Sequence, residues 1–83
     1  TPFFPSSMYL LFTTPSCPQC PRAKQFLEGK AMPFTLVDAS QPRGLDLARK
    51  YQLRTVPSLV EVDDEGLAKK SLFGAEEIIE NFS

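Results

Sequence analysis

The sequence predicts a small α/β domain whose elements follow the order β-α-β-α-β-β-α. An unbroken apolar run, Met8 to Phe12, is typical of a strand that is buried on both faces. A helical pattern follows it, and an apolar segment at Pro33 to Val37 completes a βαβ unit. Two later strand patterns are separated by a polar turn and predict an antiparallel hairpin. The 83 residues suffice for one such domain and are too few for a second core.

The first strand should be central in the sheet because its five apolar residues do not alternate with polar ones. A helix is predicted from about Pro18 to Glu28, with Gly29 as its C-terminal cap. Its apolar face is expected to contain Ala23, Phe26 and Leu27. A right-handed crossover makes the strand Pro33–Val37 parallel to the first strand.

The second half of the chain supplies the remaining elements. They are a turn at Asp38–Gln41, a helix from about Arg43 to Tyr51, a strand at Ser58–Val62, a polar turn at Asp63–Gly66, a strand at Ala68–Phe73 and a helix at Ala75–Phe82. Gly74 is expected to end the hairpin. Ile78, Ile79 and Phe82 form one apolar stripe on the last helix.

The first seven residues differ from the rest in composition. Thr1 to Ser7 contain two prolines and two serines, which argues against a regular element, and the chain does not begin with methionine. We expect a flexible leader or interdomain linker at residues 1–7 and the folded domain at residues 8–83. A tag remnant, or an ordered arm that covers the domain through Phe3 and Phe4, is the alternative.

The overall charge argues against several classes of partner. Nine Lys and Arg residues against ten Asp and Glu give a formal net charge of −1, so no electrostatic argument favours nucleic acid or an anionic membrane surface. No apolar run approaches the roughly 20 residues of a membrane span. We expect a soluble, monomeric and cytoplasmic protein.

Cys17 and Cys20 are the only cysteines in the chain, and they lie where the first strand pattern gives way to the helical one. Their spacing lets the two sulfurs close as a disulfide or open as a dithiol with little backbone movement, as thiol–disulfide exchange requires. Two cysteines without histidine cannot supply the about four ligands of a structural zinc site. A purely structural disulfide is disfavoured because so short a loop removes little entropy from the unfolded chain. A metal or iron–sulfur cluster shared between two copies stays open.

Together with the order of elements, two segments resemble the thioredoxin superfamily, and the compact size is similar to that of a glutaredoxin. The segments are Cys17-Pro18-Gln19-Cys20 and Thr55-Val56-Pro57, which precedes the third strand. The resemblance covers Met8 to Phe82. It implies a four-stranded mixed sheet with three flanking helices, and a cis Val56–Pro57 bond that faces the cysteines. It also implies that Thr55 and Val56 pair their backbone with an extended substrate.

The position of the cysteines suggests their roles. A thiol at a helix N-terminus faces unpaired backbone N–H groups and the positive end of the helix dipole, which favour the thiolate. We therefore expect Cys17 to attack a partner's disulfide and Cys20 to resolve the mixed disulfide, which leaves a redox-active Cys17–Cys20 disulfide and needs no bound cofactor. Pro18 should stiffen the loop. We expect Arg22 and Lys24 to be ordinary surface charges.

Several residues depart from the usual patterns of glutaredoxins and of thioredoxins, and they bear on which of these two groups the chain resembles more. Glutaredoxins usually carry Lys where this chain has Thr14 and Tyr where it has Gln19, which leaves open whether glutathione binds. Thioredoxins usually carry Trp at the place of Ser16 and a buried Asp at the place of Leu11. With Gln19 before the second cysteine, the motif is similar to that of the small glutaredoxin-like redoxins. Those proteins reduce ribonucleotide reductase and take electrons from thioredoxin reductase.

We therefore expect a dithiol reductant of protein disulfides. A ribonucleotide reductase is the candidate partner, either as a separate protein or as the protein of which this domain is a part, and thioredoxin reductase or glutathione is the electron source. Two other classes stay open. A non-catalytic iron–sulfur or docking module would keep the fold without turnover. An exported disulfide oxidase or isomerase would share the motif, since the compartment sets the direction of electron flow.

Overall fold

The computed structural model describes residues 7–30, 33–63 and 65–82. Its elements are β1 (Ser7–Thr13), α1 (Cys20–Gly29), β2 (Phe34–Asp38), α2 (Pro42–Lys50), β3 (Ser58–Asp63), β4 (Ala68–Phe73) and α3 (Ala75–Phe82). The strands form one mixed sheet in the order β2-β1-β3-β4. β1 is parallel to β2 and antiparallel to β3, and β3 is antiparallel to β4. The predicted element order and the central place of the first strand are confirmed.

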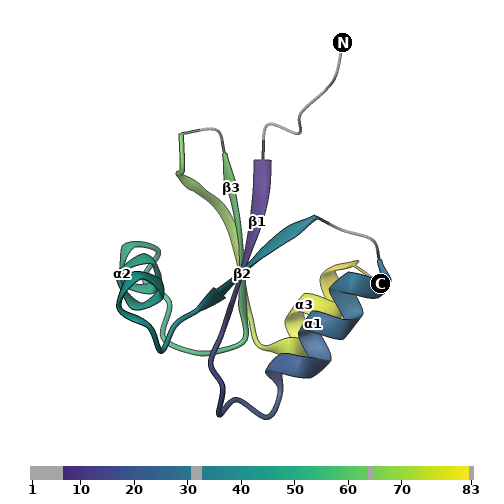
Figure 1. The fold of residues 1–83 in the computed structure, drawn as a ribbon. Helices are drawn as coiled ribbons and strands as arrows, with labels where there is room; N and C mark the ends of the chain where they lie inside the picture. The colour runs from purple at the N-terminus through teal and green to yellow at the C-terminus, as the bar shows by residue number, and fades with distance from the viewer. Residues whose placement is uncertain (1–6, 31–32, 64, 83) are drawn as a thin grey trace.

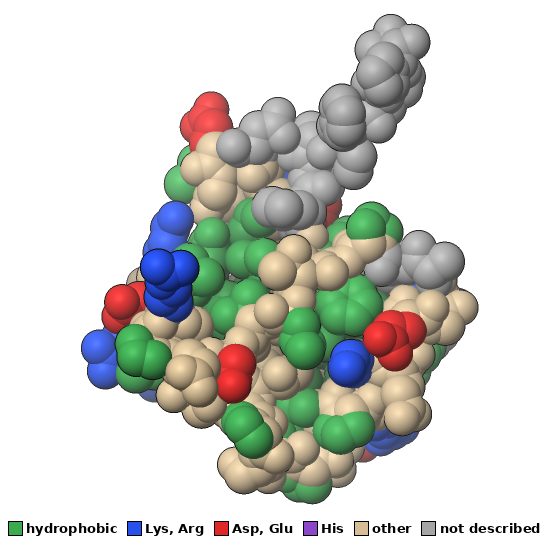
Figure 2. All heavy atoms as spheres, viewed as in Figure 1, with side chains coloured by type: hydrophobic (Ala, Val, Ile, Leu, Met, Phe, Trp, Pro, Cys, Tyr) green, Lys and Arg blue, Asp and Glu red, His purple; other side chains and the backbone are tan. Residues whose placement is uncertain are grey.

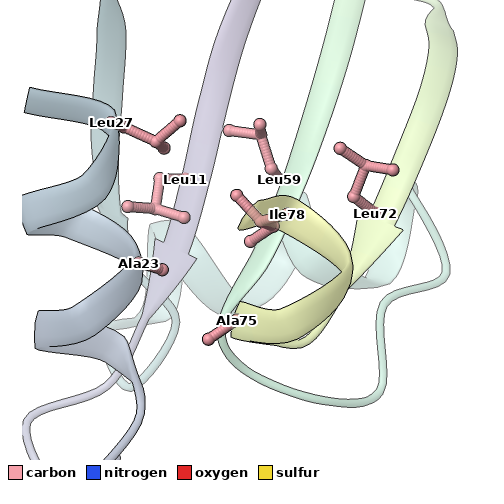
Figure 3. Close-up of a cluster of buried hydrophobic side chains, with 7 residues drawn as sticks. All are labelled: Leu11, Ala23, Leu27, Leu59, Leu72, Ala75 and Ile78. Atoms are coloured by element: carbon pink, nitrogen blue, oxygen red, sulfur yellow. The ribbon is translucent and has the colours of Figure 1, made fainter. Parts of the chain in front are cut away.

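The sheet is covered on both faces. Figure 1 shows α1 and α3 side by side on one face and α2 on the other. Successive residues of a strand point to opposite faces, so Leu11 enters one core and Phe12 the other, and both are fully buried. The core under α1 and α3 (Figure 3) contains Leu11, Ala23, Leu27, Leu59, Leu72, Ala75 and Ile78. The core under α2 contains Phe12, Ala48, Val60 and Val62. Burial on both faces explains why the first strand pattern lacks alternation.

Several element boundaries differ from the prediction. β1 begins at Ser7, so the last residue of the predicted leader belongs to the sheet, while residues 1–6, with the alternative arm through Phe3 and Phe4, lie outside the described residues. β2 and α2 are each displaced by one residue. Within the described residues, no helix has the length and apolar character needed to cross a membrane.

Both ends of α1 differ from the prediction. The helix begins at Cys20 rather than near Pro18, with Gln19 as the N-cap residue. The predicted C-cap role of Gly29 is wrong, because Gly29 is the last helical residue and Lys30 is the cap. Lys30 keeps a right-handed backbone conformation and donates its N–H to the carbonyls of Phe26 and Leu27. Neither Gly29 nor Lys30 has a positive φ.

The turn between β2 and α2 brings the helix unusually close to the strand end. The Asp38 carboxylate accepts hydrogen bonds from the Ser40 hydroxyl at 2.6 Å and the Ser40 N–H at 2.9 Å, and these bonds lower the pKa of Asp38. Gly44 in α2 is buried against the Asp38 carbonyl, and a Cβ at this position would overlap that carbonyl. Glycine is needed at this position because the backbones approach each other, although it is a poor helix former.

Replacing Gly44 with alanine tests this close approach. Gly44→Ala is expected to lower the free energy of unfolding by about 1–3 kcal/mol, because the added methyl group displaces α2 from the end of β2. Urea denaturation followed by circular dichroism measures the change.

Gly29→Ala is the matched control, because a Cβ at Gly29 meets nothing within 4 Å. It is expected to be neutral or to stabilise the protein by up to about 1 kcal/mol, the helix-propensity difference between the two residues. A Gly44→Ala variant as stable as the Gly29→Ala variant would contradict the proposed overlap.

Candidate active site

The two cysteines lie where β1 connects to α1, and they form a disulfide. Their Cα atoms are 5.5 Å apart. Cys20 is the first residue of α1 and only 4% of it is exposed, whereas Cys17 lies in the preceding turn and is partly exposed. The two residues therefore differ in accessibility. Pro18 and Gln19 are exposed between them, and the Gln19 side chain makes no capping hydrogen bond.

One hydrogen bond links the helix N-terminus to the sulfur of the more exposed cysteine. The backbone N–H of Cys20 donates to Cys17 Sγ at 3.1 Å. The turn is held by the Cys17 N–H, which donates to the Thr14 carbonyl at 3.2 Å. The Cys20 N–H belongs to the first helical turn, where N–H groups have no acceptor within the helix. In the reduced protein the same donor would favour a thiolate on Cys17.

The segment Thr55-Val56-Pro57 lies at the same edge of the sheet as the cysteine turn. Ser58 at the start of β3 pairs with Phe12 near the end of β1, so the two connections leave the sheet side by side. Thr14 from one connection and Thr55 and Val56 from the other line a common cavity of about 240 Å³. Sequence positions about 40 residues apart are thereby brought together, as expected for antiparallel strands.

The Val56–Pro57 bond is cis, the isomer that the resemblance implies, and hydrogen bonds hold this segment at two points. The Ser58 side chain is fully buried, and its hydroxyl donates to the Thr55 carbonyl. The Pro57 carbonyl accepts the N–H of Gly74 at 2.8 Å. Gly74 has a φ of 89°, a conformation that favours glycine, so it can end β4 and turn its N–H toward Pro57.

The sequence analysis did not single out Ser58. Its only signal is a hydroxyl at the head of a largely apolar segment, and nothing in the local sequence shows whether that position is buried. Ser58 is buried and its hydroxyl is satisfied by this hydrogen bond, which contributes about 0.5–1.5 kcal/mol to stability, as a typical intramolecular hydrogen bond does.

Ser58→Ala is therefore expected to lower the free energy of unfolding by about 0.5–1.5 kcal/mol, measured by urea denaturation. Ser71→Ala is the control, because Ser71 is half-buried in β4 and has no side-chain hydrogen bond within the described residues. The control should change stability by less than about 0.5 kcal/mol. Equal effects of the two substitutions would show that the hydroxyl of Ser58 has no particular role.

A groove of about 340 Å³ opens on the other side of the cysteine turn, between α1 and β2. Cys17 and Cys20 both line it, together with Lys24 of α1 and Leu36 of β2. The groove is not predicted from the sequence, and Lys24, which was expected to be an ordinary surface charge, lines it together with Glu28 of the same helix.

Comparisons with known proteins agree with this geometry. The glutaredoxin family model matches residues 10–67. A thioredoxin structure from Malassezia sympodialis is similar, with 17% identity over 93% of this chain and 69% of that chain and a TM-score of 0.78. A Fasciola hepatica thioredoxin has 23% identity over 93% of this chain and 81% of that chain, with a TM-score of 0.71. A Thermus thermophilus thioredoxin has 24% identity over 92% of this chain and 68% of that chain, with a TM-score of 0.66.

These structural similarities show a thioredoxin-like fold, and identities this low show nothing more specific. No curated protein matches the chain in a sequence search. The family assignment therefore depends on the glutaredoxin match, which covers well over half of the chain.

Proposed function

This chain belongs to the glutaredoxin family, and on that premise we propose that it is a thiol–disulfide oxidoreductase that reduces disulfides in a protein partner. The observation that carries the proposal is the disulfide at the start of α1, in which Sγ of the partly exposed residue Cys17 accepts the Cys20 N–H. A sulfur that is both accessible and hydrogen-bonded as an acceptor has the environment of a reactive cysteine.

The proposed reaction begins from the dithiol form. The Cys17 thiolate attacks one sulfur of the partner's disulfide, so that a mixed disulfide forms and the partner's other sulfur leaves as a thiolate. Cys20 then attacks Cys17 Sγ, which releases the second partner sulfur and forms the Cys17–Cys20 disulfide. Two electrons and two protons pass to the partner, which leaves as a dithiol.

The difference in burial supports this division of roles. Cys17 can meet a partner, whereas Cys20 is covered yet has its Cα only 5.5 Å from that of Cys17. Leu11 is fully buried in β1, at the place where thioredoxins usually carry a buried Asp. The proton of Cys20 would therefore pass to the leaving thiolate or to water rather than to a carboxylate at this position.

We propose that the backbone of Val56 binds the partner's backbone. Thr55 holds this segment in place through its hydrogen bond with Ser58. The Thr55 carbonyl already accepts the Ser58 hydroxyl. Within the described residues, no hydrogen bond involves the backbone of Val56, which precedes the cis bond. An extended partner chain could pair with the N–H and carbonyl of Val56, as edge pairing in a sheet does.

The partner and the electron source are further parts of the proposal. The resemblance of the Gln19-containing motif to small redoxins favours a ribonucleotide reductase as the partner, and thioredoxin reductase or glutathione would reduce the Cys17–Cys20 disulfide again. A reductant of this kind belongs in the cytoplasm, where thiols are kept reduced.

The reduction potential of the cysteine pair tests the direction of electron flow. We expect a reversible two-electron couple near or below the glutathione poise of the cytosol, roughly −220 to −260 mV by extraction methods. Thiol trapping in defined redox buffers measures it, and a comparison of glutathione with thioredoxin reductase as donor then assigns the electron source. A potential near about −120 mV would identify an oxidase, and the lack of any reversible couple would favour a docking or iron–sulfur module.

Single cysteine variants test the division of roles. Cys20→Ser is expected to accumulate a mixed disulfide with oxidised insulin, because Cys17 can still attack but nothing resolves the product. Cys17→Ser should form at most a few per cent as much. Non-reducing gel electrophoresis and mass spectrometry measure the adduct. Accumulation in Cys17→Ser instead would reverse the assignment of the nucleophile.

A further inference from the structure

The proposed reaction requires Cys20 to act as a thiolate, although little of this residue meets solvent. Only 4% of Cys20 is exposed, and the core beneath α1 is apolar. Burial disfavours the charged form of a thiol. The hydrogen bond at the start of α1 goes to Cys17 Sγ and not to the sulfur of Cys20. A charge that stabilises the Cys20 thiolate therefore has to lie on the side of Cys20 that faces the groove between α1 and β2.

This groove brings Lys24 together with Cys20. Both residues line it, and its volume is about 340 Å³. They are four residues apart in α1, so their Cβ atoms lie about 5–6 Å apart, and side chains of a helix lean toward its N-terminus. The Lys24 side chain is therefore placed over the helical turn that contains Cys20.

Lys24 is the charged groove residue nearest to Cys20. Glu28 also lines the groove, but it lies two helical turns from Cys20, about 12 Å along the helix axis, whereas Lys24 lies about 6 Å away. A charge at the larger distance is mostly screened at physiological ionic strength. Cys17 is the other titratable lining residue, and it is uncharged in the resolving step because it is held in the mixed disulfide. The remaining lining residues carry no charge.

The neighbouring elements bring no further charge into the groove. The acidic residues of α3, which lies beside α1, are exposed and do not line the groove; they are Glu76, Glu77 and Glu80. Arg54 lines the separate cavity on the other side of the cysteine turn. On the face shown in Figure 2, positive and negative side chains are interspersed. Lys24 has no ion pair or hydrogen bond with another described residue, so its charge remains available to Cys20.

We propose that Lys24 is a positioning residue for the resolving step, in which its ammonium group stabilises the Cys20 thiolate that attacks Cys17 Sγ. The inference rests on the proposed function. In this step the Cys20 proton passes to solvent in the groove, and the bond between Cys20 and Cys17 forms. The bond between Cys17 and the partner's sulfur breaks, and that sulfur leaves with the electron pair. Lys24 thus differs from the exposed Arg22, which does not line the groove.

A stopped-flow reaction with dipyridyl disulfide separates the two steps. This disulfide is uncharged near neutral pH, so Lys24 does not attract it, and each half leaves as a thiopyridone that is detected by its absorbance. Attack by Cys17 releases the first thiopyridone in a second-order phase, and attack by Cys20 releases the second in a first-order phase. The reduced full-length protein is mixed with an equimolar amount of the reagent, and the rate constant of the second phase is measured against pH.

Lys24→Met is expected to raise the midpoint of this pH profile by about 0.5–1 pH unit, less than a buried ion pair would, because Lys24 is partly solvated. Below the midpoint the thiolate of Cys20 becomes scarcer, although each thiolate becomes more nucleophilic. The second phase should therefore be about two- to threefold slower below the midpoint and no slower above it.

Three further substitutions locate the effect. Lys24→Arg keeps the charge and should keep the wild-type midpoint. Arg22→Met removes the same charge from another face of α1, and Glu28→Gln removes the more distant negative charge, so each should move the midpoint by less than about 0.3 pH unit. The thiolate absorbance of Cys17→Ser, after subtraction of that of the Cys17→Ser/Cys20→Ser double variant, gives the midpoint of Cys20 at equilibrium. Lys24→Met should raise this midpoint by the same amount.

The stoichiometry of the reaction separates failure of this inference from failure of the proposed function. The inference is overturned if the midpoints of the wild type and Lys24→Met agree within about 0.2 pH unit. It is also overturned if Lys24→Met slows the second phase equally at every pH, or if Lys24→Arg slows it as much, because either result indicates a structural role. If the wild type releases only one thiopyridone for each disulfide consumed, Cys20 does not resolve the mixed disulfide and the proposed function itself fails.

Discussion

The double burial of β1 is the constraint on which the remaining structure depends. β1 is hydrogen-bonded to β2 on one edge and to β3 on the other, and its two faces enter separate cores through Leu11 and Phe12. A strand held in this way has a fixed register, because a shift by one residue would exchange the two cores. The turn that follows β1 therefore leaves the sheet at a defined point, and the cysteines follow a strand that is fixed by both of its neighbours and by both cores.

The chemistry proposed for the cysteines depends on backbone groups more than on charged side chains. The Cys20 N–H reaches Cys17 Sγ because the helix begins at Cys20 and leaves this donor without an intrahelical acceptor. On the neighbouring connection, the Ser58 hydroxyl and the Gly74 N–H fix the segment around the cis bond. Both halves of the candidate site are thus held by hydrogen bonds at the ends of regular elements, where backbone groups are available.

Local sequence patterns determined the order of the elements, the central strand and the cysteine pair, and placed β4 and α3 at their observed bounds. They succeeded because apolar periodicity and turn residues act over a few neighbouring positions. Only the tertiary structure showed that Gly44 is required where α2 meets Asp38, that Ser58 is buried, and that Leu36 is left uncovered. These three properties arise where segments distant in sequence approach or fail to approach each other, and no local pattern reports such distances.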